Sequence, residues 1–208
     1  MFDFDLLHII AGVPGLIIAM VVHEYAHAQT AVWLGDITPR MMGRLTLNPK
    51  AHIDPIGMLM LFLVHFGWAK PVMINANNFK NPRRDDILVS LAGPFANFAT
   101  AFLALVALLV YRKMGGDMTT GMYWVFQLII EYNIGFGIFN LIPLPPLDGS
   151  HVLMRLLPSD MAYKLAGLER YSFIILIVLL MTPVLSMILI PCRALIWTIF
   201  SLLLKPFF

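Results

Sequence analysis

The stretch VVHEYAHAQ, residues 21–29, decides how this chain is interpreted. It contains His-Glu-x-x-His, a pattern typical of helices that bind zinc through two histidines and use the glutamate as a base. The same stretch lies inside residues 6–33, an apolar run long enough to cross a bilayer as a helix. The sequence therefore places a site that needs water inside a segment that favours lipid.

Composition indicates an integral membrane protein. The 208 residues are 60% hydrophobic and only 12% charged, whereas soluble domains carry about 25% charged residues. A net charge of +2 without any block of basic residues gives no support for a nucleic-acid partner. The single cysteine, Cys192, excludes a disulfide framework and a cysteine-based metal cluster. The lipid bilayer is the expected surrounding.

Hydropathy predicts one membrane domain, residues 1–208, with an all-α polytopic fold. The first three expected spans would form a catalytic core, and the fourth would follow as a C-terminal membrane helix. The four expected spans are residues 6–33, 86–111, 119–142 and 171–190. Residues 192–208 are apolar enough for a further membrane helix, although Arg193 and two prolines leave its depth open.

Residues 35–84 interrupt this pattern with several prolines and asparagines, and we expect a small β-rich and re-entrant insert there. RLTLN (44–48) and KPVMIN (70–75) alternate or run short, as strands do. Between them IGMLMLFLVHFGWA (56–69) is apolar but too short to cross comfortably, which favours a re-entrant or interfacial helix.

Basic residues predict the orientation. Most of them fall in 35–84 and 155–170, on one side of the membrane. The other side has Arg112, Lys113 and Arg193, together with the acidic Asp3 and Asp5. The positive-inside rule then places 35–84 in the cytoplasm and the N-terminus outside. We expect a multi-pass protein of the cytoplasmic membrane with its site in the cytoplasmic half.

Helical spacing defines the roles within the motif. His23 and His27 are one turn apart and project from the same face, so both imidazoles can reach one zinc ion. Glu24 lies about 100° around the helix from His23 and is placed to act as general base toward water. The alternative is a polar face packed against other helices, because such residues avoid lipid.

A catalytic zinc site has three protein ligands and one open position. Asp148 is the best candidate for the third ligand, since the third span runs inward and delivers it to the membrane side where His23 and His27 lie. The alternatives are that Asp148-Gly149 is simply a turn that ends a helix, or that His151 is the ligand instead.

Amides supply further candidates. Asn133 and Asn140 are seven residues apart, nearly on one helix face, and an amide there could donate to a developing oxyanion. Asn140 could instead be a helix cap. Asn97 follows Gly93 and Pro94 in the second span, where close helix packing is the first interpretation and support of the site is the second.

These residues together resemble the site-2 protease family of intramembrane zinc metalloproteases. The family's hallmarks are HExxH in one transmembrane helix and an N-x-x-P-x-P-x-x-D-G motif at the end of a later one, and residues 23–27 and 140–149 match them. The Gly-Pro-x-x-Asn stretch at 93–97 is similar to the family's middle core helix. The short link between the spans 86–111 and 119–142 predicts a minimal member without a PDZ domain.

The resemblance implies regulated intramembrane proteolysis, with a transmembrane protein as the substrate. It implies one zinc ion per chain held by His23, His27 and Asp148, with Glu24 activating water and Asn140 orienting the substrate or steadying the oxyanion. A strand at 44–48 or 71–75 would pair with the unwound substrate.

Other function classes remain open. A membrane metal transporter or metal sensor also places histidines and carboxylates in spans. It would distribute polar residues through the full bilayer, whereas here they converge on one depth. An inactive relative that only binds membrane proteins, or a zinc hydrolase acting on lipid, is a further alternative. The sequence gives neither the substrate's identity nor the oligomeric state.

Overall fold

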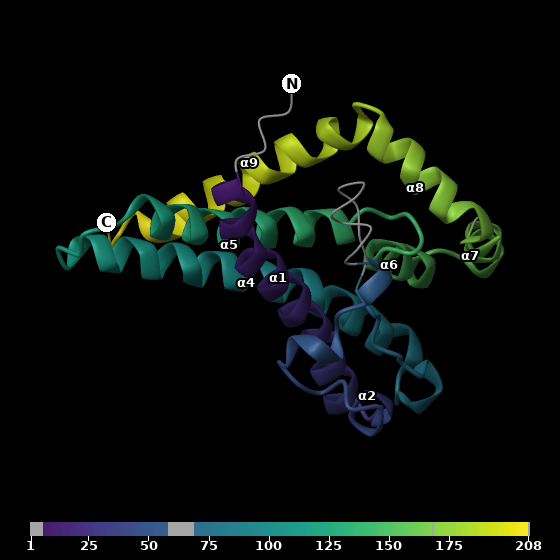
Figure 1. Ribbon diagram of the computed structural model, residues 1–208. Coiled ribbons are helices and arrows are strands. Elements are labelled where there is room, and N and C mark those ends of the chain that lie inside the picture. The colour runs from purple at the N-terminus through teal and green to yellow at the C-terminus, as the bar shows by residue number, and fades with distance from the viewer. Residues whose placement is uncertain (1–5, 58–68, 168, 208) are drawn as a thin grey trace.

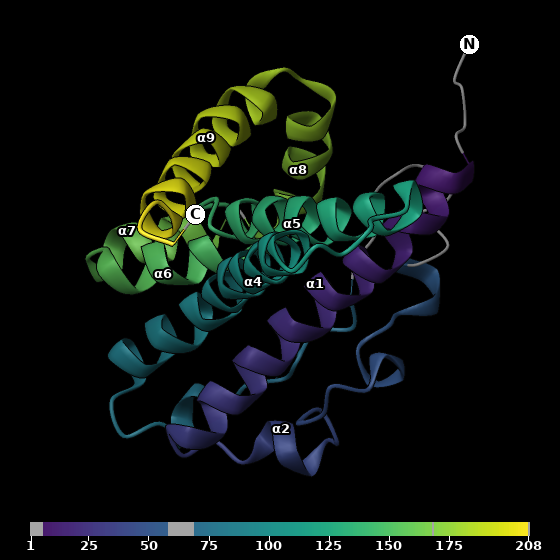
Figure 2. The same ribbon diagram turned by 90° about the vertical axis from the view of Figure 1, so that its left-hand side faces the viewer.

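The computed structural model describes residues 6–57, 69–167 and 169–207, and Figure 1 shows that most of this chain is helical. Three long helices pack against one another at its centre: α1 (Leu6–Trp33), α4 (Pro82–Lys113) and α5 (Thr120–Asn140). Figures 1 and 2 show α1 crossing α4 and α5 obliquely. This helical core agrees with the predicted all-α membrane fold.

Three helices of the described chain are long and apolar enough to cross a membrane: Ile10–Trp33, Pro82–Lys113 and Val184–Leu204. The central helix α5 is not among them, because polar side chains such as Gln127 and Glu131 interrupt its apolar sequence. It packs against both other core helices, α1 and α4.

Small residues and a row of isoleucines hold the core together. Ile130, Ile134 and Ile138 recur every fourth residue on one face of α5, where they form a buried cluster with residues of α4 and α9. On α1, a Cβ added at Gly15 would lie 2.8 Å from the backbone oxygen of Leu128. The missing side chain therefore allows α1 and α5 to approach closely.

After the core, the second half of the chain continues with four shorter helical elements and the long helix α9. These are α6 (Asp148–Leu156), α7 (Ser159–Ala166), η3 (Glu169–Tyr171), α8 (Ser172–Met181) and α9 (Val184–Leu204). The expected division into a span at 171–190 and a tail at 192–208 differs from this arrangement. Pro183 lacks an N–H and separates α8 from α9, so residues 184–190 belong to the helix that continues to Leu204.

Helix α9 turns back and packs on α5, as Figure 1 shows. Phe200 of α9 belongs to the buried isoleucine cluster of α5. Arg193 of α9 forms an ion pair with Glu131 of α5. Pairing is the expected way to accommodate two charged side chains in such apolar helices.

The insert between α1 and α4 contains α2 (Thr38–Met41), η1 (Pro49–Ala51) and η2 (Ala76–Asn78). Its two ends are joined by Asp36, a fully buried residue just after α1. The Asp36 carboxylate accepts hydrogen bonds from Thr38, from the N–H of Asn75 at 2.8 Å and from the side chain of Asn78 at 2.7 Å. Burial alone would raise the pKa of this carboxyl, but these donors outweigh it and hold the pKa below its usual value.

The predicted β-rich character of the insert is wrong. In the part of the chain that the structure describes, no strand forms, and one isolated bridge joins Ile53 to Ala69. The physical reason is that backbone groups of both expected strands bind side chains. The carbonyl of Thr46 contacts the ring of His52, and the N–H of Val72 donates to Glu24. The expected re-entrant helix at 56–69 lies mostly outside the described residues.

Candidate metal centre

Two histidines on one face of α1 begin the site. His23 and His27 are 3% and 6% exposed, and their Nε2 atoms lie 3.0 Å apart. Helix α4 passes directly against both rings at Gly93, where an added Cβ would lie 2.5 Å from Nε2 of His27. Only a residue without a side chain fits at this position.

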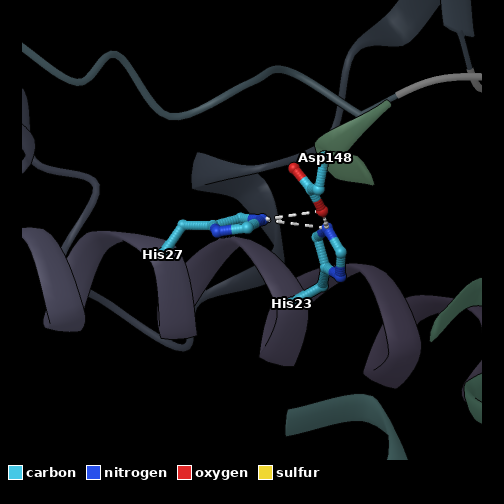
Figure 3. Close-up of side chains that lie close together, drawn as sticks. All are labelled: His23, His27 and Asp148. Carbon is cyan, nitrogen blue, oxygen red and sulfur yellow. Dashed lines mark hydrogen bonds and ion pairs between the residues drawn. The ribbon is translucent and has the colours of Figure 1, made fainter. Parts of the chain in front are cut away.

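The third group arrives from the start of α6. The proline-rich run after Asn140 folds back at the end of α5, and Leu147 anchors it by packing against Ile142 and Leu176. Asp148 follows Leu147 directly in the sequence. Figure 3 shows His23 and His27 pointing from α1 toward Asp148. The Oδ2 atom of Asp148 lies 3.0 Å from Nε2 of His23 and 3.3 Å from Nε2 of His27.

Hydrogen bonds on the far side of each ring set the tautomers. Nδ1 of His27 lies 2.7 Å from the backbone carbonyl of Val89, which can only accept, so this nitrogen carries the hydrogen. Nδ1 of His23 lies 2.7 Å from Oδ1 of Asn97, whose amide nitrogen donates to another carbonyl, that of Ala19. A neutral imidazole has one N–H. Both Nε2 atoms therefore present lone pairs to Asp148.

With both imidazoles neutral, as metal ligands are, three electron-pair donors meet with no hydrogen between them. The Oδ2 atom of Asp148 is buried and receives no hydrogen bond from the described residues. Such a cluster needs a cation, and two histidines with one carboxylate are a common donor set for zinc. Ligand atoms at about 2.0–2.1 Å in a tetrahedron lie about 3.4 Å apart, close to the 3.0–3.3 Å observed here. The residues present fit zinc.

Glu24 lies in the same cavity as these three donors. The cavity has a volume of about 490 Å³ and is bordered by α1, α4, the end of α5, the start of α6 and the extended residues 71–74. The N–H of Val72 donates to Oε2 of Glu24 at 3.0 Å, so the extended segment holds the carboxylate in place. Oxygen and nitrogen donors and a positioned carboxylate in one cavity that can hold water are suited to hydrolysis.

The other predicted residues divide between the cavity and the core. Asn140 lines the cavity and donates from Nδ2 to the carbonyl of Phe136 at 3.0 Å. His151 also lines the cavity, but the described group that could hold a metal contains Asp148 instead. Asn133 is fully buried in the core and is not among the described residues that line the cavity.

Two contacts at the site were not anticipated from the sequence, and support of the site by Asn97 was only the second interpretation of that residue. The carbonyl of Val89 and the N–H of Val72 are backbone groups, and no residue type signals them. Asn97 was visible as an amide in an apolar helix, four residues after Gly93 and so on the same face. That shared spacing was the signal that could have assigned Asn97 to the histidines rather than to helix packing.

Comparisons with known proteins identify the family of the chain. A family model described as peptidase family M50 matches residues 110–183. YwhC of Bacillus subtilis, named as a candidate zinc metalloprotease, is 39% identical over 92% of this chain and 91% of its own length. Rip2 of Mycobacterium tuberculosis, similarly named, is 31% identical over 84% of this chain and 68% of its own length.

No solved structure matches the chain. Residues 114–119 alone join α4 to α5, so no PDZ domain is inserted there, as the sequence predicted. With similarity to YwhC over nearly the whole length of both proteins, the chain belongs to peptidase family M50, the site-2 protease family of zinc metalloproteases, and is an integral membrane protein.

Proposed function

We propose that this chain is an intramembrane zinc metalloprotease that hydrolyses peptide bonds of transmembrane protein substrates. The observation that carries the proposal is one cavity in which three lone-pair donors and the carboxylate of Glu24 lie together. His23, His27 and Asp148 would hold one zinc ion per chain. When bound, zinc supplies a Lewis acid that polarises a peptide carbonyl and makes a water molecule more acidic.

Glu24 is the general base of this proposal. One of its oxygens is fixed by the N–H of Val72, which keeps the carboxylate facing the cavity. A carboxylate in this position accepts a proton from the attacking water and delivers it to the amine that leaves. The Val72 contact therefore orients the base without supplying a proton of its own.

Asn140 is proposed to steady the oxygen of the attacked peptide. One N–H of its amide is used by the carbonyl of Phe136. An amide nitrogen has a second N–H, and Asn140 borders the cavity where that hydrogen could reach a developing oxyanion.

The extended residues 71–74 are the proposed support for the substrate backbone. A peptide bond in a transmembrane helix must leave its helical hydrogen bonds before it is attacked, and an unwound segment needs new partners. Residues 71–74 border the cavity in an extended conformation. Residues 44–48 are not among its described lining residues, which favours the 71–75 version of the predicted pairing.

We further propose that the protein lies in the cytoplasmic membrane with its N-terminus outside. Residues 35–84, which carry half of the lysine and arginine residues of the chain, follow α1 on the side where its histidines lie. Water would reach the cavity from this side, past the extended segment. The polar insert makes an entry from the cytoplasm less costly than one through lipid.

The test is cleavage in lipid vesicles that contain the purified protein and a synthetic single-pass helix with a Gly-Pro step near its cytoplasmic end, which weakens the helix. Wild type is expected to contain about one zinc ion per chain, held by three protein ligands. It is also expected to cleave the helix. Glu24→Gln should keep the zinc and lose cleavage, because glutamine still accepts from Val72 but cannot take a proton.

Asp117→Asn is the matched control, since it also replaces a carboxylate by an amide, at an exposed position away from the cavity. It should retain both zinc and cleavage. Cleavage by Glu24→Gln at the wild-type rate would refute the assigned base. Zinc flux into vesicles that survives Glu24→Gln, without cleavage by wild type, would favour a transporter instead.

A further inference from the structure

Two buried amides connect the core of the helix bundle to His23. Asn133 of α5 and Asn97 of α4 are both fully buried. Nδ2 of Asn97 donates to Oδ1 of Asn133 at 3.0 Å, and Oδ1 of Asn97 accepts from Nδ1 of His23 at 2.7 Å. The three side chains come from three different helices and form one continuous line of hydrogen bonds.

Backbone carbonyls fix the direction of this line. Nδ2 of Asn133 donates to the carbonyl of Ile129 at 2.8 Å, so its oxygen must face Asn97. Nδ2 of Asn97 gives its other hydrogen to the carbonyl of Ala19 at 2.8 Å, so its oxygen must face His23. Carbonyls accept only, and neither amide can be reversed without placing acceptor against acceptor. The hydrogen of His23 is thereby held on Nδ1.

Helix packing alone does not explain why these positions carry amides. Burying an amide costs free energy that its hydrogen bonds must offset, and apolar side chains of similar volume would pack the helices as well. Neither amide is among the described residues that line the cavity, so neither has access to substrate there. What the two amides have in common is that their hydrogen bonds orient the imidazole ring of His23.

We propose that Asn97 and Asn133 are positioning residues that hold His23 in its Nδ1–H form, with Nε2 aimed at the metal site. The inference rests on the proposed zinc site but not on protease activity. His27 needs no equivalent side chain, since the backbone carbonyl of Val89 does the same for its ring. Groups that orient a metal-binding histidine from behind raise the affinity of the site.

The test measures zinc affinity of the full-length protein in detergent by competition with a chelator, and the visible absorption spectrum of the protein loaded with Co²⁺. Asn97→Leu is expected to weaken zinc binding by about 10–100-fold and to change the Co²⁺ bands. Asn133→Leu should produce a smaller loss in the same direction, because Ala19 still orients Asn97.

Two further variants separate positioning from structure. Asn133→Asp, which full burial keeps protonated, has an oxygen that accepts from Asn97 and an O–H that donates to the carbonyl of Ile129, and it should restore affinity toward wild type. Thr100→Val, also on α4, removes a hydrogen bond to the carbonyl of Ala96 that does not connect to His23, and should leave affinity unchanged.

Wild-type affinity and an unchanged Co²⁺ spectrum in folded Asn97→Leu would overturn the proposal. If that variant does not fold, Asn133→Leu decides, and wild-type affinity there would overturn it equally. Because no substrate enters these measurements, wild type that binds zinc but cleaves nothing would refute the protease and leave this inference standing.

Discussion

Gly93→Ala is the smallest change that should disable the site without replacing a ligand. The added methyl group would lie 2.5 Å from Nε2 of His27 and 2.6 Å from Cε1 of His23. Ordinary contact begins near 3.4 Å, so the His27 ring or helix α4 must move by about 0.9 Å. A displacement of about 1 Å at a reacting centre can cost about 100-fold in rate.

Zinc affinity should fall along with the rate, by about tenfold or more, because the lone pairs no longer meet at one point. Chelator competition on the purified protein measures the affinity, and cleavage in vesicles measures the rate. Loss of folding is not the expected cause, since alanine favours helix over glycine by about 1 kcal/mol.

Gly135→Ala provides the matched control. Gly135 lies within α5, and a Cβ added there meets no atom within 4 Å. This variant should keep zinc binding and cleavage and be no less stable than wild type. Wild-type zinc affinity in Gly93→Ala would show that α4 does not constrain the histidines, and would refute the reasoning.

Other substitutions test the third ligand and the insert. Asp148→Ala should remove zinc from the purified protein, whereas His151→Ala should retain it, because the described metal-binding group contains Asp148, whose carboxylate lies near both Nε2 atoms. The measurement is the zinc content per chain. Zinc retained by Asp148→Ala would contradict the assignment. Asp36→Ala should lower the free energy of unfolding by about 2–3 kcal/mol, because Thr38, Asn75 and Asn78 lose their charged acceptor, and denaturant titration measures the loss. Folding holds the pKa of the Asp36 carboxyl below its usual value of about 4. The stability that the ionised carboxylate contributes is therefore complete above about pH 4 and is lost as the pH falls below it. Wild type should therefore lose more stability than Asp36→Ala on acidification, and parallel pH profiles would contradict this.

The parts of the site that follow from spacing could be predicted from the sequence. The four-residue spacing from His23 to His27 is about one helical turn, which is a local property of any α-helix. The expected direction of each successive span then predicted that Asp148 lies close to the two histidines, and the structure brings these three residues together. Neither step depends on how side chains pack, which is why the sequence was sufficient for both.

The insert could not be predicted in the same way, because its conformation depends on distant partners. KPVMIN reads as a strand by residue type, but the N–H groups of Val72 and Asn75 bind Glu24 and Asp36, which lie far away in sequence. Strand propensity describes a pleated surface with neighbours. Here the carboxylates of Glu24, within α1, and Asp36, just after it, accept backbone hydrogen bonds that a neighbouring strand would otherwise accept.

The histidines are seated by α4 as much as they are presented by α1. Val89, Gly93 and Asn97 are spaced by four residues and so form one row along the helix. Val89 fixes the His27 ring through its carbonyl, Gly93 leaves room for both rings, and Asn97 fixes the ring of His23. The geometry of HExxH is therefore completed by a row that supplies no ligand. Rotating or shifting α4 by one residue would disrupt all three contacts together, so metal binding also depends on the packing of α4 against α1.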